Sequence, residues 1–533
     1  MYDLLVKNAK LYDGCGGPWF KGDLAVKDGR IASIGKMKNA EARTVIDAEG
    51  KALSPGFIDA HTHLDFVCAS VNDTASKVTQ GVTTEIAGNC GLSLIPVRPE
   101  TIEELKRYLA PFIPQDVNLS WKWKSLGDWF DSVDERGNST NVASLVGHGT
   151  LRIYAMGFAD RKPSGQEMAE MKRALAQTME EGSLGLSTGL IYPPGCYSDT
   201  DELSELCEVV AEHGGLYVTH MRNEGPELLQ SVEEALEIGR RSGCPVHISH
   251  HKSSGRQNYG LVSRSLQMME DARAEGIDVT CDVYPYTAGS TLISSLLPKW
   301  VHEGGVGRML ERLKDPASRR KIADELDRVI PGWENLAKGC GWENILICSC
   351  EKEPSYEGKT VTEIADGRGT SPEEALFDVI LETEGKATIA LFMMDEKDCS
   401  TVLAHPLSMV GSDGFASSFS GVLSKGKPHP RSFGTFPRVL GKYVREEGLM
   451  SLEKAIWKMT GFAAQRFGLK DRGFLREGMV ADLVVFDPLE IIDNATYKEP
   501  RQQAEGIDYV ILGGEVVVDH KVYNGKTLGR SLR

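Results

Sequence analysis

The feature that most constrains the fold is an alternation of short apolar runs with amphipathic stretches, from about residue 55 to about residue 474. Eight of the apolar runs have the length of buried strands, and helical stretches lie between most of them. Strands that alternate with helices form parallel sheets, and eight of them close a (β/α)8 barrel of the TIM type, in the α/β class. The expected strands are Gly56–His63, Thr83–Cys90, Val142–His148, Leu184–Gly189, Leu216–His220, Val246–His250, Ile277–Tyr284 and Met409–Asp413.

The helices between these strands are defined by their apolar periodicity. The clearest are Gln166–Glu181, Asp199–His213, Pro226–Ser242 and Leu261–Ala274. The stretch from Tyr284 to Met409 is too long for one loop and one helix. We therefore expect an inserted, mostly helical segment near residues 300–355, which is a candidate lid.

The two ends of the chain are both rich in short strands. Residues 1–54 contain runs such as Leu4–Val6 separated by Gly and Asp turns, and Ala481–Phe486 belongs to a similar series at the other end. Neither end is long enough to form a sandwich alone. We expect residues 1–54 and 475–533 to form one small β-sandwich domain, interrupted by the barrel at residues 55–474.

Composition restricts the partners and the compartment. The chain has 533 residues and a formal net charge of −16, which argues against a nucleic-acid partner. No apolar run reaches the ~18 residues of a membrane span, and the N-terminus lacks the features of a signal peptide. The 11 cysteines are scattered without a CxxC pair, which is typical of reduced thiols. These features predict a cytoplasmic protein whose partner is neither a nucleic acid nor a membrane, and they leave the oligomeric state open.

Metal-capable or acidic side chains end five of the expected strands, where barrels of this type carry their active sites. They are His61 with His63, Cys90, His220, His250 and Asp413. His61 and His63 are two positions apart and therefore face the same side of their strand. A single histidine at a strand end is more often a hydrogen-bonded structural group. Five coincident placements favour a shared metal site.

The types of these side chains indicate the metal and the chemistry. Nitrogen and thiolate ligands suit zinc, which lowers the pKa of bound water to about 7 and polarises a carbonyl group. Cys90 alone could equally be a small buried apolar residue. Attack by water requires a base that later protonates a leaving nitrogen, and Asp413 is the natural candidate.

A serine-hydrolase interpretation is much weaker. Gly185–Gly189 has the GxSxG pattern of a nucleophile elbow, but such an elbow requires a helix directly afterwards. Leu190–Gly195 follows instead, and its two consecutive prolines prevent an immediate helix.

Six local motifs follow one another along the chain. They are Gly56–His63, Gly88–Gly91, Thr219–Glu224, Ser249–Lys252, Asp282–Tyr286, and Pro428–Arg431 with Gly434–Arg438. In this order they resemble the amidohydrolase superfamily, and more narrowly its N-acyl-D-amino-acid deacylases (D-aminoacylases). The resemblance covers nearly the whole chain and implies a metal-dependent barrel with a small β domain.

The resemblance implies roles for the metal-capable residues. Cys90, His220 and His250 match the positions that hold a tight zinc ion. His61 and His63 match a second, weaker metal position. Most members of the superfamily bridge two metals with a carboxylated lysine, whereas this family uses the cysteine that Cys90 matches.

It also implies the acid/base and substrate contacts. Asp413 matches the general acid/base, and Lys252, Tyr284 and Arg431 match residues that bind the α-carboxylate of the substrate. Arginine suits this task because it forms a bidentate fork with a carboxylate. Without the resemblance, Lys252 and Arg431 would be read as solvated surface charges. Tyr192 is a further candidate for substrate contact, and simple packing explains it equally well.

The implied function is zinc-dependent hydrolysis of the amide bond of N-acyl-D-amino acids. Two alternatives stay open: a related amidohydrolase that acts on cyclic amides or D-dipeptides, and a non-catalytic scaffold with the same fold. The Ser- and Gly-rich segment 415–427 departs from the shortest family members and is expected to line the pocket. The uncharged run Thr287–Leu297 argues against an acidic substrate side chain.

Overall fold

A computed structural model describes residues 1–533 and contains all eight expected strands. They are β6 (Phe57–Asp59) continued by β7 (Thr62–His63), β8 (Val82–Ala87), β9 (Asn141–Ser144) continued by β10 (Val146–Gly147), β11 (Gly185–Gly189), β12 (Leu216–His220), β13 (Val246–Ile248), β14 (Val279–Val283) and β18 (Ser408–Val410). Several of these strands end two or three residues earlier than expected, so that Cys90, His250 and Asp413 lie in the turns that follow.

Hydrogen bonds close the eight strands into a ring. β6, β8 and β9 pair in parallel, and β10, β11, β12, β13, β14 and β18 pair in parallel in that order. The backbone of Leu145, between β9 and β10, donates to Ala87 at 2.9 Å and links the two sheets. On the other side, the Ala60 amide donates to the Val410 carbonyl at 3.3 Å. The predicted parallel barrel is therefore confirmed.

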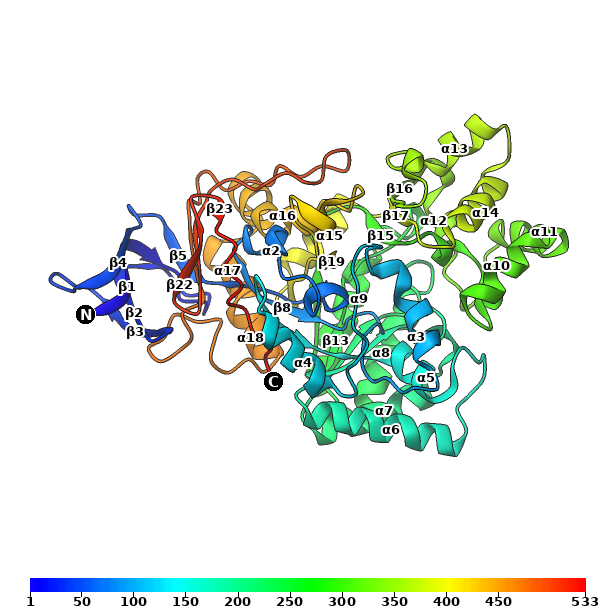
Figure 1. The fold of residues 1–533 in the computed structure, drawn as a ribbon, viewed down its shortest axis with the longest axis horizontal. Helices are drawn as coiled ribbons and strands as arrows, with labels where there is room; N and C mark the ends of the chain where they lie inside the picture. The colour runs from blue at the N-terminus through cyan, green and yellow to red at the C-terminus, as the bar shows by residue number, and fades with distance from the viewer.

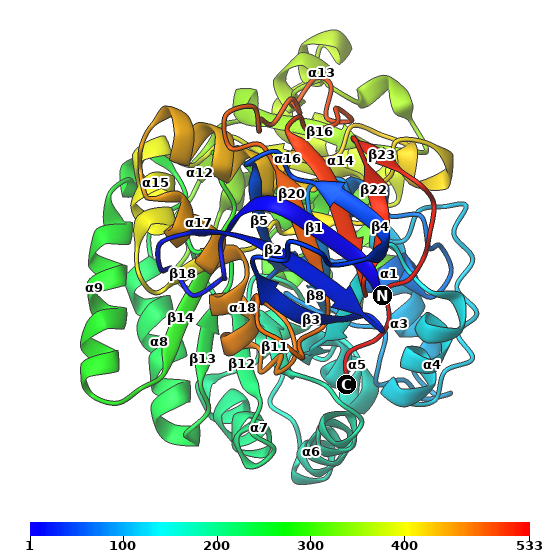
Figure 2. The same cartoon turned by 90° about the vertical axis from the view of Figure 1, so that its left-hand side faces the viewer.

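The four clearest predicted helices surround the barrel (Figure 2). α6 (Gly165–Glu180), α7 (Thr200–Glu212), α8 (Leu228–Ser242) and α9 (Leu261–Ala274) begin and end within two residues of the expected bounds. Local chemistry explains these bounds: Ser164 and Glu167 form a capping box at the start of α6. None of the helices in the structure combines the length and the apolarity needed to cross a bilayer.

Strands from both ends of the chain form one nine-stranded sheet at one side of the molecule (Figure 1). They are β1 (Tyr2–Leu11), β2 (Phe20–Lys27), β3 (Arg30–Gly35), β4 (Ala42–Asp47) and β5 (Ala52–Pro55), with β20 (Leu483–Phe486), β21 (Ile507–Leu512), β22 (Glu515–Asp519) and β23 (Val522–Tyr523). The sheet branches at β1, which pairs with β4 along its first half and with β5 along its second. Antiparallel pairing of β5 with β20 joins the two ends of the chain.

Both faces of β20 are buried, which explains its continuous apolar sequence. Leu483 and Val485 belong to a core shared with the N-terminal strands. Val484 and Phe486 alternate with them and belong to the large core of the barrel. The side chains on one face of β20 therefore pack within the terminal sheet's own core, and those on the other face hold this sheet against the barrel.

The segment inserted between β14 and β18 is larger than expected and is not only helical. Its helices include α10 (Val306–Lys314), α11 (Pro316–Leu326), α12 (Leu336–Cys340), α13 (Val361–Arg368) and α14 (Pro372–Thr383). They accompany a three-stranded antiparallel sheet of β15 (Gly289–Leu292), β17 (Thr388–Leu391) and β16 (Ile345–Ser349). The expected range 300–355 missed β15 and β17 because their pairing joins residues about a hundred positions apart. In Figure 1 the insert lies at the side of the barrel opposite to the terminal sheet.

Candidate active site

The predicted metal-capable residues meet at the C-terminal mouth of the barrel. They are His61, His63, Cys90, His220, His250 and Asp413, and all are buried. Sγ of Cys90 lies 3.4 Å from Nε2 of His61 and 3.5 Å from Nε2 of His250. One ligand atom each from these three residues and from Asp413 lies within 4.8 Å of the others. Nε2 of His63 lies 3.2 Å from Oδ1 of Asp413.

Backbone conformation turns three of these side chains toward one another. Cys90, His250 and Asp413 have φ angles of 56°, 36° and 51°, in the left-handed region that residues other than glycine seldom adopt. Such conformations cost about 1–3 kcal/mol each and concentrate at functional sites. These strained residues follow closely after the ends of their strands. Their backbone conformation turns the side chains toward the C-terminal mouth of the barrel.

The site stabilises two anions among the imidazoles. Burial alone would raise the pKa of the Cys90 thiol, but the His61 charge and the nearby rings of His220 and His250 bring that pKa well below its ordinary value. Burial opposes ionisation of Asp413 as well, and the Arg431 guanidinium is the main group that holds its pKa well below the usual range. A thiolate and a carboxylate therefore face several histidine nitrogens.

Ring nitrogens in this cluster remain without hydrogen-bond partners. Both nitrogens of His220 are buried and unpaired. A buried polar atom without a partner costs about 1–3 kcal/mol, and most buried polar atoms in proteins avoid that cost. A divalent cation held by Cys90, His220 and His250 would satisfy one of the two His220 nitrogens, and two imidazoles with a thiolate are a donor set that suits zinc.

Glu224 fixes one of the metal-capable histidines and was missed as a functional residue in the sequence. Its Oε1 lies 3.0 Å from Nδ1 of His250, which leaves Nε2 of that ring facing Cys90. Both of its oxygens accept hydrogen bonds from Nζ of Lys252, at 2.7 and 2.8 Å. Its place inside the motif Thr219–Glu224 was the only signal that could have revealed this role.

Asp282 contacts two of the metal-capable histidines and was also missed as a functional residue in the sequence. Its Oδ1 accepts a hydrogen bond from the His250 amide at 2.9 Å, and its Oδ2 lies 2.9 Å from Nε2 of His247 and 3.5 Å from Nδ1 of His61. The carboxylate is fully buried. It therefore contacts the backbone of one predicted metal ligand, His250, and lies beside the ring of another, His61, which are positions that a metal site needs fixed.

The four predicted substrate-binding residues line one cavity with the metal-capable cluster. The cavity has a volume of about 50 Å³, and these four residues are Lys252, Tyr284, Arg431 and Tyr192. Arg431 is only 2% exposed and Lys252 only 5%, so the interpretation of either as a solvated surface charge is wrong.

Each of these residues has a defined partner within the protein. Nη1 of Arg431 lies 2.8 Å from Oδ2 of Asp413, and the guanidinium lies 4.7 Å above the Tyr284 ring. The hydroxyl of Tyr192 lies 2.9 Å from Oγ1 of Thr291, which belongs to the insert. The mouth of the barrel and the insert therefore both contribute to this cavity.

Ser187 of the GxSxG pattern is structural. It lies inside β11, its hydroxyl donates a hydrogen bond to the Gly88 carbonyl, and it accepts one from the Gly91 amide. The side chain thus fixes the turn that contains Cys90. The weak serine-hydrolase interpretation has no support in this geometry.

Comparisons with known proteins agree with this arrangement. Residues 44–518 match the sequence profile described as the amidohydrolase family. The chain belongs to the amidohydrolase family. This amidohydrolase is 37% identical to a D-aminoacylase of Alcaligenes xylosoxydans xylosoxydans, over 100% of the chain and 97% of the relative. It is also 37% identical to an N-acyl-D-aspartate deacylase of that organism, over 97% of the chain and 92% of the relative.

Solved structures give the same result. A crystal structure of a D-aminoacylase matches this amidohydrolase with a TM-score of 0.82 and 36% identity, over 100% of the chain and 99% of the relative. An N-acyl-D-glutamate deacylase from Bordetella bronchiseptica, complexed with zinc and a phosphonate that mimics the tetrahedral intermediate, matches with a TM-score of 0.82 and 33% identity, over 99% and 98%. The predicted resemblance to N-acyl-D-amino-acid deacylases and the predicted fold are confirmed.

Proposed function

We propose that this amidohydrolase uses zinc to hydrolyse the amide bond of N-acyl-D-amino acids, which releases a carboxylic acid and a free D-amino acid. The observation that carries the proposal is a single buried pocket that combines a thiolate and imidazole ligand set, the carboxylate of Asp413 and the guanidinium of Arg431. Full-length relatives at 35–37% identity are named for this type of reaction, which supports it.

Cys90, His220 and His250 would hold the tight zinc ion, and His61 with His63 a second, weaker one. Bound zinc supplies a water molecule of lowered pKa and polarises the amide carbonyl. In a D-aminoacylase of similar fold, one metal ion of the binuclear centre is reported to activate the enzyme and the second to attenuate it. We infer that the His61 and His63 position adjusts the activity rather than generating it.

Asp413 would act as the general acid/base. Its lowered pKa keeps it ionised near neutral pH, so it can accept a proton from the attacking water. Arg431 contacts Oδ2, which leaves Oδ1 on the side of the histidines. Asp413 would then return the proton to the leaving nitrogen, so that the product leaves as an amine.

Arg431 and Tyr284 would bind the α-carboxylate, because a guanidinium can present two parallel donors to a carboxylate. Lys252 lines the same cavity, but Glu224 neutralises it, so we assign it the weaker share of this contact. Both cations of the cavity are thus assigned to the α-carboxylate, so neither remains for a charged side chain, which favours an uncharged substrate side chain. Tyr192 would contact the substrate from the side of His220.

A substrate panel with a metal analysis tests the proposal. Purified protein is assayed for amine release from N-acetyl-D-amino acids, their L-isomers, cyclic amides and D-dipeptides, and its zinc content is measured. We expect bound zinc and selective hydrolysis of the N-acetyl-D compounds. Hydrolysis confined to cyclic amides or dipeptides would establish the neighbouring activity instead, and protein without zinc or turnover would be the scaffold.

A further inference from the structure

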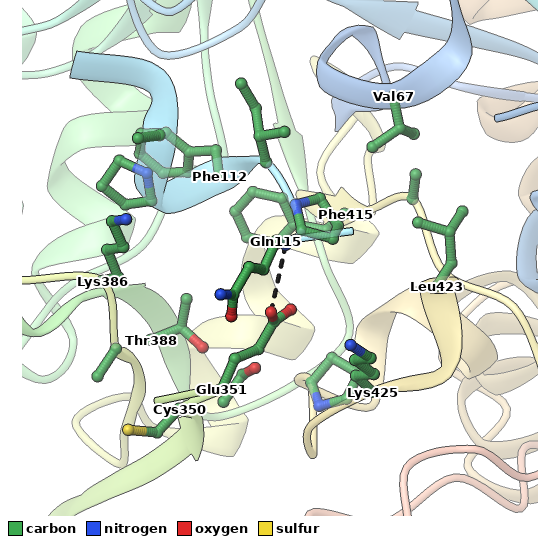
Figure 3. Close-up of a pocket in the computed structure, with 18 of the residues that line it drawn as sticks. Val67, Phe112, Gln115, Cys350, Glu351, Lys386, Thr388, Phe415, Leu423 and Lys425 are labelled. Carbon is green, nitrogen blue, oxygen red and sulfur yellow. Dashed lines mark hydrogen bonds between the residues drawn. The ribbon is translucent and has the colours of Figure 1, made fainter. Parts of the chain in front are cut away.

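A second and larger cavity opens beside the metal-capable cluster (Figure 3). Its volume is about 190 Å³, compared with about 50 Å³ for the cavity that contains Arg431. The two cavities share three lining residues, His63, Phe112 and Phe415. The rings of His63 and Phe415 are 5.2 Å apart and those of Phe112 and Phe415 are 6.0 Å apart, so these three aromatic side chains lie along the boundary between the two cavities.

Five segments that are distant in the sequence build the larger cavity. They are residues 63–67, residues 110–115, residues 349–352 and 383–388 of the insert, and residues 415–428. In Figure 3 Phe112 and Phe415 lie on one side, Val67 and Leu423 on another, and the charged side chains lie below them. The part next to the active site is therefore apolar. This cavity contains none of the residues proposed to bind the α-carboxylate.

We propose that the larger cavity binds the acyl chain of the substrate, and that it suits an uncharged straight chain of about six to eight carbons. The inference rests on the proposed hydrolysis of N-acyl-D-amino acids. In such a substrate the side chain and the carboxylate share one carbon atom, on the nitrogen side of the scissile bond. With the carboxylate held at Arg431 in the smaller cavity, the acyl chain on the other side of the carbonyl is the part directed past His63 into the larger one.

The charges at the rim of the larger cavity favour an apolar chain over a dicarboxylic one. Lys352 and Lys386 both contact Glu384, at 2.6 and 3.8 Å. Lys425 is paired with Asp116. The Glu351 carboxylate accepts a hydrogen bond from the backbone amide of Gln115 at 3.2 Å, which is the bond drawn in Figure 3. Every lysine at the rim thus lies within 4 Å of an acid, with Glu384 shared by two of them, so none is an unpaired cation for a second carboxylate on the substrate.

The volume sets the expected chain length. An apolar cavity of about 150 Å³ holds benzene, so about 190 Å³ holds at least six carbon atoms, whereas the smaller cavity does not. Removing one methylene from water contributes enough free energy for about a fourfold change in an equilibrium or rate constant. We therefore expect kcat/KM to rise about fourfold for each methylene added, until the cavity is full.

The experiment compares N-acetyl, N-butanoyl, N-hexanoyl, N-octanoyl and N-dodecanoyl derivatives of one uncharged D-amino acid. The readout is kcat/KM for each derivative relative to N-acetyl. In the wild-type protein this ratio is expected to rise to the hexanoyl or octanoyl derivative and to stop rising at dodecanoyl. Ala416→Phe fills the cavity, since Ala416 lines it, and is expected to lower the octanoyl-to-acetyl ratio at least tenfold.

Ser420→Phe is the matched control, because Ser420 lies in the same segment but is exposed and lines neither cavity. It is expected to keep the wild-type ratio. If Ala416→Phe does not fold, Val422→Phe in the same wall replaces it. A flat wild-type ratio, or a ratio that Ala416→Phe leaves unchanged, overturns the acyl-chain assignment alone. No hydrolysis of any derivative, including N-acetyl, overturns the proposed function and this inference together.

Discussion

Replacement of Glu224 by glutamine tests the buried network that supports the proposed metal site. The Glu224 carboxylate is 4% exposed and is surrounded by the Lys252 ammonium and the His250 ring. Burial alone would raise its pKa, but Lys252 and the two neighbouring imidazoles hold that pKa far below the usual range. Glutamine keeps the shape and removes the charge, so Lys252 loses its anionic partner without gaining water.

The expected loss in the free energy of unfolding follows from this burial. Removing one partner of a buried ion pair costs about 3–5 kcal/mol, because the remaining charge is left uncompensated. Lys252→Met should cost a similar amount, since it leaves the carboxylate without its ammonium. The double variant removes both charges, and we expect its loss of stability to be smaller than the sum of the single losses by about 2–3 kcal/mol.

The assay is urea unfolding of the metal-free protein for the wild type, both single variants and the double variant. Glu515→Gln is the control, because its pair with Lys526 is exposed and is expected to contribute less than about 1 kcal/mol. A competition titration with a chelator should also show zinc affinity reduced about 10- to 100-fold in Glu224→Gln, because the His250 ring loses its orienting partner. Additive single losses, or unchanged stability and zinc affinity in Glu224→Gln, would refute this reasoning.

Three further substitutions test the proposed roles. Cys90→Ala should lose the tight zinc on dialysis while Cys399→Ala, at another buried cysteine, retains it; equal zinc content in both would contradict the ligand assignment. Asp413→Asn should retain zinc but lower kcat about 10²- to 10⁴-fold in a steady-state assay, and a kcat near the wild-type value would exclude an acid/base role. Arg431→Lys should raise KM for N-acetyl-D-amino acids about 10- to 100-fold, as expected for the loss of a charged hydrogen bond; an unchanged KM would remove Arg431 from the carboxylate site.

The sequence alone determined the barrel and the position of the reactive residues. Apolar runs and amphipathic periodicity are local signals, so all eight strands and the four clearest helices were predicted to within a few residues. A closed parallel barrel brings the C-terminal ends of all its strands together. For this reason residues as distant as His61 and Asp413 could be expected in one cluster before any contact was known.

Only the tertiary structure decided which side chains pair and how much space surrounds them. Periodicity contains no information on partners, so it could not show that Glu224 neutralises Lys252 or that Asp282 supports both His61 and His250. The antiparallel sheet of the insert joins segments about a hundred residues apart, which no local pattern indicates. The 190 Å³ cavity is formed by five separate segments, and its volume depends on how closely their side chains approach. Residue types therefore predicted the chemistry, while packing between distant segments fixed the shape of the cavities.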